Sequence, residues 1–265
     1  MRRGAVWGAS AAAVAAMVVL AVLVANSRTG PQMPSLPSTL PEVSAQTPSP
    51  SGTSGPLFPT QSVEELVIPT AEIPAVAGLP ATPDTGGGPM YAETTAVDPN
   101  FISPSPCARM PVAGLGSLFR GSGWISSRYQ QSWGKASAKD TKFAWRVTQF
   151  IAVYPGADQA RNLVSAARGF FGMCANQSID ATHDPPRADE PNPIYWSVNA
   201  LQGSLREPTT TISLTQEGGG GWKMWRAVAA HNNVAMDLVF AAQDAPESAV
   251  QAMVQAIKNR VDAAR

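Results

Sequence analysis

The chain is poor in the residues on which catalysis and metal binding most often depend. Its 265 residues include two histidines and two cysteines, and only 14% of them are charged. The sequence contains no Gly-x-Ser-x-Gly nucleophile motif and no His-Glu-x-x-His metal motif. His183 and His231 also lack the spacing of metal ligands. We therefore expect a protein that is not an enzyme, with no catalytic residue, no bound metal and no cofactor.

An excess of charge of one sign is also missing. The chain has 19 basic and 19 acidic residues, so its formal net charge is zero with neutral histidine. Residues 28–100 contain no lysine, whereas residues 101–265 carry an excess of about four positive charges. Nucleic-acid binding requires dense lysine and arginine to displace counterions from phosphates. This composition argues against a nucleic-acid partner.

The one long apolar run stands at the amino terminus. Residues 5–25 contain no charged side chain and follow Arg2 and Arg3. About 20 helical residues cross the ~30 Å hydrocarbon core of a bilayer, and basic residues favour its cytoplasmic side. We predict that residues 1–27 form an anchor that crosses the cell membrane once, through residues 5–25, and leaves the carboxy-terminal part extracytoplasmic. The alternative is a cleaved signal peptide and a secreted protein.

Residues 28–100 have the composition of a disordered linker. They hold more than half of the 24 prolines, together with many serines and threonines. Such a segment has too few large apolar side chains to offset the conformational entropy lost on ordering. Two apolar islands interrupt it, at residues 63–67 and 73–79. They either fold back onto a neighbouring domain or belong to the linker.

Residues 101–265 have the size and composition of one folded domain. They contain six of the seven tryptophans and both cysteines. An even number of cysteines in an exported chain favours a disulfide, here between Cys107 and Cys174. Two unpaired, buried thiols are the alternative.

Hydrophobic periodicity within this domain predicts an α+β fold. Apolar residues alternate over residues 143–153, as in a half-buried strand, and then recur at helical spacing from Ala160 to Cys174. A second helix closes the chain, and we expect Asp244 and Glu247 to form a capping box at its start. Further β-type segments occupy residues 195–201, 209–216, 222–230 and 233–241.

The adjacent residues Asn232 and Asn233 predict the register of one hairpin. Neighbouring asparagines tolerate positive φ and suit a two-residue type I′ turn. Such a turn places Met224 directly across from Ala241. Strand alternation then places Trp225 and every second residue from it on a core face, and places the residues between them on the opposite face.

Five side chains are candidates for ligand binding. Trp124, Trp133 and Trp196 lie in or beside less regular segments, and aromatic faces bind sugars, lipids or cations where they line a cleft. Arg226 and Asp237 are within diagonal reach on the hairpin's opposite face. They form either part of a ligand site or an ordinary cross-strand ion pair worth less than about 1 kcal/mol.

The acidic, proline-rich loop over residues 176–192 offers the remaining chemistry. His183 with Asp184 could hold a cation. Asp184, Asp189 and Glu190 could act as a carboxylate pair on a glycan. The alternative in both cases is a set of solvated loop residues without chemical function.

Several of these segments resemble one known family. The sequences Trp222-Lys-Met-Trp-Arg-Ala, Asn233-Val-Ala-Met-Asp and Phe171-Gly-Met-Cys, with Val147-Thr-Gln-Phe-Ile-Ala-Val-Tyr-Pro, are similar to motifs of the PknH-like extracytoplasmic sensor domains of mycobacteria. The resemblance covers about residues 106–265. It implies a twisted, mainly antiparallel sheet packed by helices around a cleft for an unidentified ligand. In the family such domains are attached to receptor serine/threonine kinases or occur without a kinase. We expect the second arrangement here.

The resemblance also carries expectations about disulfides and function. Members commonly hold two disulfides; Cys107 and Cys174 match the first, and the second would fall at Met224 and Ala241. The implied function is that of a membrane-anchored sensor of the cell envelope, whose ligand is a glycolipid, a peptidoglycan fragment or a protein. Two alternatives remain open: a secreted envelope hydrolase with an unrecognised site, and a structural partner of an envelope complex.

Overall fold

The computed structural model describes residues 57–82, 84–88, 99–140, 142–185, 193–202 and 208–264. The predicted membrane anchor at residues 1–27 and the predicted linker as far as residue 56 lie outside the described residues. None of the helices in the described part combines the length and the apolar character needed to cross a bilayer.

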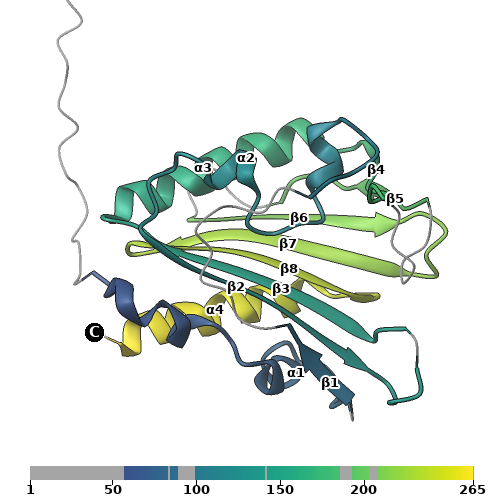
Figure 1. The fold of residues 1–265 in the computed structure, drawn as a ribbon, viewed down its shortest axis with the longest axis horizontal. Helices are drawn as coiled ribbons and strands as arrows, with labels where there is room; N and C mark the ends of the chain where they lie inside the picture. Colours follow the sequence, from purple (N-terminus) through teal and green to yellow (C-terminus); the bar gives the residue numbers. More distant parts are fainter. Residues whose placement is uncertain are drawn as a thin grey trace, which may run out of the picture. The chain divides into compact units, whose positions relative to one another are not determined.

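The domain is built on one eight-stranded sheet in which every neighbouring pair of strands is antiparallel (Figure 1). The strands lie in the order β1-β2-β3-β8-β7-β6-β5-β4. The predicted α+β fold with a mainly antiparallel sheet is therefore confirmed. The strands are β1 (Asp84–Gly87), β2 (Ser126–Lys135), β3 (Trp145–Val153), β4 (Ser178–Asp180), β5 (Tyr195–Val198), β6 (Thr209–Gln216), β7 (Trp222–His231) and β8 (Val234–Gln243).

Helices cover both faces of this sheet (Figure 1). We call the two sides the α3 face and the α4 face. The α3 face carries α3 (Ala157–Cys174), α2 (Gly116–Phe119) and the 3-10 helix η3 (Pro106–Arg109). The α4 face carries α4 (Glu247–Ala263), α1 (Ile73–Val76) and the 3-10 helices η1 (Thr60–Leu66) and η2 (Thr70–Glu72).

The two long helices follow the predicted apolar stripes. The buried side chains of α3 include Leu163 and Val164, and those of α4 include Met253, at the spacing of one helix face. No side chain caps α4, which begins after Pro246, so the predicted capping box is wrong. Asp244 instead adopts a φ of 51° and its N–H donates to the Gly221 carbonyl.

The β7–β8 hairpin has the predicted register. Met224 pairs with Ala241, and His231 pairs with Val234 across the two-residue turn. Of the two turn residues only Asn232 has a positive φ, 52°, whereas a type I′ turn requires positive φ at both positions. The predicted turn type is therefore wrong. Because helices cover both sides of the sheet, the hairpin has two buried faces and not the single core face that alternation suggests.

The segment from residue 57 to residue 79, predicted as linker, folds onto the α4 face. Its large apolar side chains join one cluster with α4 and the central strands. Both apolar islands thus fold back onto the domain. The predicted domain boundary at residue 100 is wrong, because residues 57–82 and the edge strand β1 belong to the folded unit. The buried apolar side chains of the segment include Phe58, Val63, Leu66, Val67, Ile68 and Ile73.

Two buried amide side chains of the sheet fasten this segment. The Asn233 amide accepts from the Phe58 N–H at 2.7 Å and donates to the Phe58 carbonyl at 3.1 Å. The Gln149 amide makes the same two bonds to Ile68, at 3.0 Å and 2.9 Å. Backbone groups that leave water need a partner. The two amides therefore allow an irregular segment to be buried without unsatisfied backbone groups at these points.

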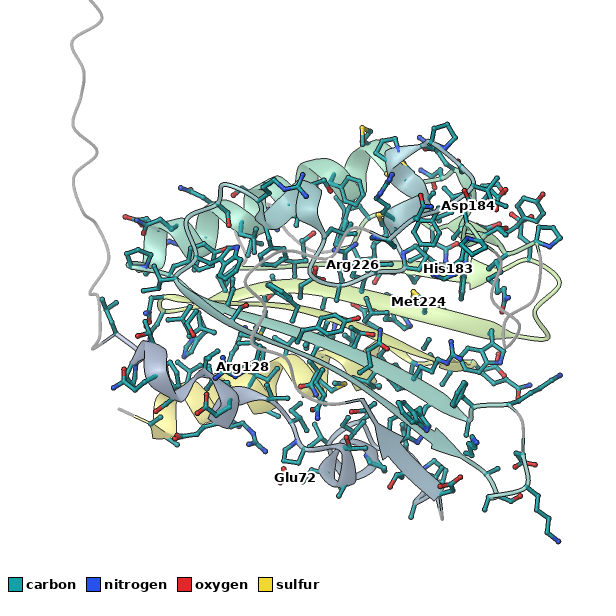
Figure 2. All side chains as sticks on the ribbon, viewed as in Figure 1. Glu72, Arg128, His183, Asp184, Met224 and Arg226 are labelled. Carbon is teal, nitrogen blue, oxygen red and sulfur yellow. A yellow bond between two sulfur atoms is a disulfide. The ribbon has the colours of Figure 1, made fainter. Side chains whose placement is uncertain are left out.

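Two ion pairs border the same contact. Glu64 lies 2.9 Å from Arg128, and Glu72 lies 2.6 Å from Arg260. Figure 2 shows Glu72 and Arg128 on this side of the sheet. All four side chains are partly exposed, so each pair contributes less than about 1 kcal/mol. Apolar burial and the two amides hold the segment.

Removal of residues 1–100 should abolish stable folding, whereas removal of residues 1–56 should not. Burial of each large apolar side chain contributes about 1.5–3 kcal/mol. Six of them together approach the whole stability of a typical domain, about 5–15 kcal/mol. Thermal unfolding of residues 57–265 and 101–265, followed by circular dichroism, measures the difference. Equal melting temperatures would contradict the docking of this segment.

The double substitution Met224→Cys with Ala241→Cys should form a cross-strand disulfide and raise the melting temperature. The two residues are direct partners in the register, and closing so short a loop restricts the unfolded chain by about 3 kcal/mol in the entropy model. The two single-cysteine variants and the reduced double variant serve as controls. An oxidised double variant that melts with the single variants would count against this pairing.

Candidate functional site

A buried ion pair lies at the centre of the α3 face. The side chains of Arg226 on β7 and Asp237 on β8 are both 0% exposed. Arg226 Nε donates to Asp237 Oδ1 at 2.9 Å, and Nη2 donates to Oδ2 at 2.6 Å. Its guanidinium also lies 5.3 Å from the ring centre of Phe171 on α3. The predicted diagonal contact is confirmed, but the predicted energy, which holds for exposed pairs, does not apply to a fully buried one.

The same two side chains hold a covering segment, residues 106–119, against the sheet. Arg226 Nη1 donates to the Met110 carbonyl at 3.1 Å, and the Gly114 N–H donates to Asp237 Oδ2 at 2.9 Å. Gly114 has a φ of 73°, and a Cβ at this position would lie 2.5 Å from the Phe150 ring. Only glycine permits both the conformation and this close approach.

Solvent has no access to Arg226 or Asp237 beneath the covering segment. Figure 2 shows Arg226 between the sheet and the helices of the α3 face. A ligand from solution would reach these two candidates only if the covering segment moved away. Their role in the described structure is to join β7, β8 and the covering segment.

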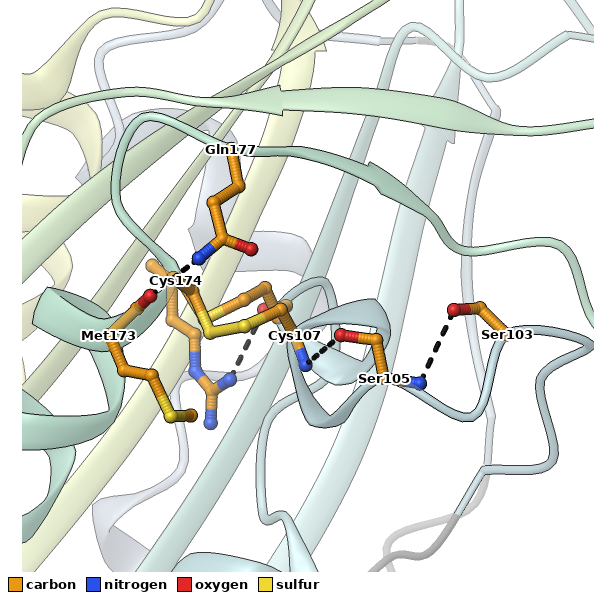
Figure 3. The surroundings of a disulfide bond; sticks show 8 residues. Ser103, Ser105, Cys107, Met173, Cys174 and Gln177 are labelled. Atoms are coloured by element: carbon orange, nitrogen blue, oxygen red, sulfur yellow. Dashed lines mark hydrogen bonds between the residues drawn. A yellow bond between two sulfur atoms is a disulfide. The ribbon is translucent and has the colours of Figure 1, made fainter. Parts of the chain in front are cut away.

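A disulfide fastens the covering segment at its other end (Figure 3). It joins Cys107 in η3 to Cys174, the last residue of α3, with 5.5 Å between the Cα atoms, as predicted. Nearby, the Cys107 N–H donates to Ser105 Oγ, and Gln177 Nε2 donates to the Met173 carbonyl. A cross-link over a sequence separation of 67 residues restricts the unfolded chain by about 4 kcal/mol in the entropy model.

An open hollow lies between residues 99–100 and the covering segment. Its volume is about 490 Å³, within the range of small-molecule sites. Arg109 of η3 and Arg120, which follows α2, are among its lining residues, and none of the lining residues is acidic. Guanidinium groups match carboxylates and phosphates in geometry and charge. The lining residues are Pro99, Asn100, Pro106, Arg109, Ser117 and Arg120.

None of the three candidate tryptophans is a lining residue of this hollow, and the described ring contacts do not join them to one another. Trp124 packs edge-on against Phe150, with 6.4 Å between ring centres. Trp196 is 7% exposed in the core of the α3 face. Trp133 lies near the carboxy-terminal end of β2, beside Phe143. Of the five candidates, the described contacts bring together only the arginine and the aspartate.

Of the predicted loop chemistry the structure describes His183 and Asp184. His183 packs against the ring of Phe101 at 4.8 Å, and His231 lies 2.8 Å from a carboxylate on α4. Asp189 and Glu190 fall outside the described residues. Within the described ranges no group of three or more His, Cys, Asp or Glu side chains is placed to hold a metal ion.

Two titratable groups away from the hollow have displaced pKa values. Burial raises the pKa of Tyr154 to about 12, against the opposing effect of its hydrogen bond with Ser122. The hydroxyls of Ser178 and Ser197 lower the pKa of Glu217 by donating to its carboxylate. Since the pKa of Tyr154 is raised, its contribution to stability is complete below about pH 10 and is lost as the pH rises through about 12.

Sequence patterns do not single out Arg109 and Arg120. They lie eleven residues apart in a segment that is not one continuous helix or strand, so no periodicity relates them. The one available signal is Cys107, because a disulfide to α3 implies that its neighbour Arg109 is held in place. The position of Arg120 depends on α2, which is too short to give a periodic signal.

Comparison with known proteins identifies relatives along most of the described chain. The family model for the PknH-like extracellular domain matches residues 58–260. The serine/threonine-protein kinases PknH of Mycobacterium bovis and of Mycobacterium tuberculosis are each 26% identical to this chain over 190 residues, 69% of its length. The matches cover 29% and 28% of the two kinases, so the chain spans less than a third of these relatives.

One solved structure shares the fold. The crystal structure of the extracellular domain of PknH from Mycobacterium tuberculosis matches with a TM-score of 0.64 at 22% identity, over 78% of this chain and 98% of that domain. The family match begins at residue 58. It therefore includes the docked amino-terminal segment, in agreement with the boundary that the structure shows.

Removing one partner of the buried ion pair should lower the free energy of unfolding more than replacing both partners. Arg226→Met or Asp237→Leu alone leaves an uncompensated buried group, with an expected loss of about 3–5 kcal/mol. Arg226→Met with Asp237→Leu should lose less than the sum of the two single changes, because no charge remains. Urea unfolding measures these differences. Glu64→Gln, which breaks an exposed pair, is the matched control and should cost less than about 1 kcal/mol; strictly additive losses would contradict the coupling.

Proposed function

The chain belongs to the family of PknH-like extracellular domains, and we propose that it is a non-catalytic sensor domain held outside the cell by a single membrane anchor at residues 5–25. Its ligand in this proposal is an anion bound in the hollow beside Arg109 and Arg120. The family match supports the extracellular position, and the charge of the hollow supports the class of ligand.

The observation that carries the proposal is the convergence of two arginines from different elements on one hollow of about 490 Å³. Arg109 comes from η3, and Arg120 comes from the turn after α2. Asn100 and Ser117 add neutral polar groups to the lining. A carboxylate or phosphate can accept hydrogen bonds from such a set while its negative charge faces positive charge.

The hollow is held in shape by its surroundings. Pro106 and Arg109 flank the disulfide residue Cys107, and Leu118 and Phe119 in α2 are buried beside the other lining residues. A site whose lining is already ordered loses less conformational entropy on binding.

Two of the expected ligand classes fit this chemistry. An envelope glycolipid with an acidic headgroup offers a phosphate or a carboxylate, and a peptidoglycan fragment offers peptide carboxylates. A protein ligand would need an exposed acidic side chain that enters the hollow. The shared feature is an anionic group, and the mass of a retained ligand distinguishes the sources.

Native mass spectrometry of the full chain tests the proposal. Protein purified from its own cell envelope should retain an acidic adduct that protein from an unrelated host lacks. Arg109→Gln with Arg120→Gln should reduce the occupied fraction by at least about tenfold, since each charged hydrogen bond contributes about 1.5–3 kcal/mol. Arg161→Gln, an exposed arginine on α3, is the matched control and should leave the adduct unchanged.

Two results would overturn the proposal. One is an adduct that the double arginine variant retains at the wild-type level, which would place the ligand elsewhere. The other is an unliganded mass from both sources, which would favour a protein partner or a structural role over a small anionic ligand.

A further inference from the structure

A second surface concentrates positive charge at a site apart from the hollow. The β2–β3 hairpin ends in a loop, and residues 135–146 include Lys135, Lys139, Lys142 and Arg146 against one acidic residue, Asp140. The turns of the β6–β7 and β7–β8 hairpins contain no lysine or arginine. The charge is therefore a feature of this hairpin and is not common to the turns of the sheet.

Two aromatic rings hold two of these cationic side chains in place. Trp133 and Phe143 pack edge to face, with 6.0 Å between ring centres. The Arg146 guanidinium lies 4.0 Å from the centre of the Phe143 ring, and Lys135 Nζ lies 5.8 Å from it. Aromatic faces attract cations, so these two cationic groups are held beside the rings. We call Trp133, Lys135, Lys139, Lys142, Phe143 and Arg146 the hairpin platform.

The edge strand β1 packs against the tryptophan of the hairpin platform. Gly86 of β1 pairs with Trp133, and a Cβ at Gly86 would lie 2.8 Å from the indole ring. The glycine thus leaves the space in which the indole is seated. Because one side of Trp133 rests on β1 and its neighbour is Phe143, the rings form a fixed base for the cationic groups.

Scattered exposed charges are sufficient for solubility. Solubility alone therefore does not require charges that are gathered beside aromatic rings. Lys139 and Lys142 are exposed, while Trp133 and Phe143 are partly buried and partly open to solvent. Tryptophan favours the headgroup level of a bilayer, and lysine and arginine favour anionic headgroups. The platform combines both preferences on one hairpin.

We infer that the hairpin platform contacts an anionic lipid surface. Each lysine or arginine close to such a surface strengthens binding by roughly fivefold, so the net charge of three that remains after Asp140 strengthens it by roughly a hundredfold. A soluble acidic polymer would meet the same charges but would offer no headgroup layer for the rings, which favours lipid. The inference does not depend on the arginine-lined hollow, so either site can fail its test without the other.

Residue-resolved lysine acetylation of the full chain tests this contact. The chain is incorporated into vesicles of phosphatidylcholine alone or of phosphatidylcholine with phosphatidylglycerol, and labelling is quantified by peptide mass spectrometry. The anionic vesicles should slow labelling of Lys139 and Lys142 by at least about fivefold. Lys258 on α4 should keep its rate. High salt should restore labelling at the hairpin, because it screens exposed charges.

A charge-reversal variant distinguishes protection by the hairpin platform from protection that arises because the whole chain is anchored close to the membrane. In Lys139→Glu with Lys142→Glu, both changes are at exposed positions, so the fold should be retained and Lys135 should lose its protection. Lys258→Glu is the matched control and should leave the protection intact. Three outcomes would overturn the inference: no protection in the wild type, equal protection in neutral vesicles, or protection by soluble polyglutamate without protection by anionic vesicles.

Discussion

The buried ion pair between Arg226 and Asp237 is the interaction on which the α3 face depends. Two opposite charges without access to solvent are tolerated only where each finds further hydrogen bonds, since desolvation otherwise exceeds their attraction. Here the additional partners are the Met110 carbonyl and the Gly114 N–H of the covering segment. The pair therefore joins the central strands to an irregular segment that has no strand or long helix of its own. With the disulfide at Cys107, it sets the wall on which the hollow is formed.

The α4 face also buries an irregular segment, but the buried side chains that bond to its backbone are uncharged amides. The irregular segment that begins at residue 57 buries apolar side chains, and its partly exposed Glu64 and Glu72 form weak ion pairs. The amides of Asn233 and Gln149 each satisfy both backbone groups of one residue in that segment. Each side of the sheet thus uses polar side chains of the central strands, or of the β7–β8 turn, to fasten an irregular segment, because buried backbone groups outside helices and strands need partners.

This construction separates the two positively charged surfaces of the domain. The hollow lies on the covering segment, whose position is set by the core of the α3 face. The hairpin platform lies at the end of β2 and β3, next to the edge strand β1, and its order comes from ring contacts at the surface. A small anion in the hollow and an anionic surface at the platform would therefore make independent contacts with one rigid sheet.

Because the chain has two cysteines, one pairing within it was possible. The sequence by itself also determined the elements whose signals are local: the apolar stripes of α3 and α4 and the β7–β8 register around Asn232. Their periodicity and turn chemistry depend on near neighbours in the chain. It did not reveal β2, whose serine and glutamine residues lack a strong apolar alternation, nor the docking of residues 57–79, which resembles linker by composition. Tertiary structure alone decided that Arg226 is buried and that Arg109 and Arg120 share a hollow, because burial and convergence arise from contacts between segments that no local pattern relates.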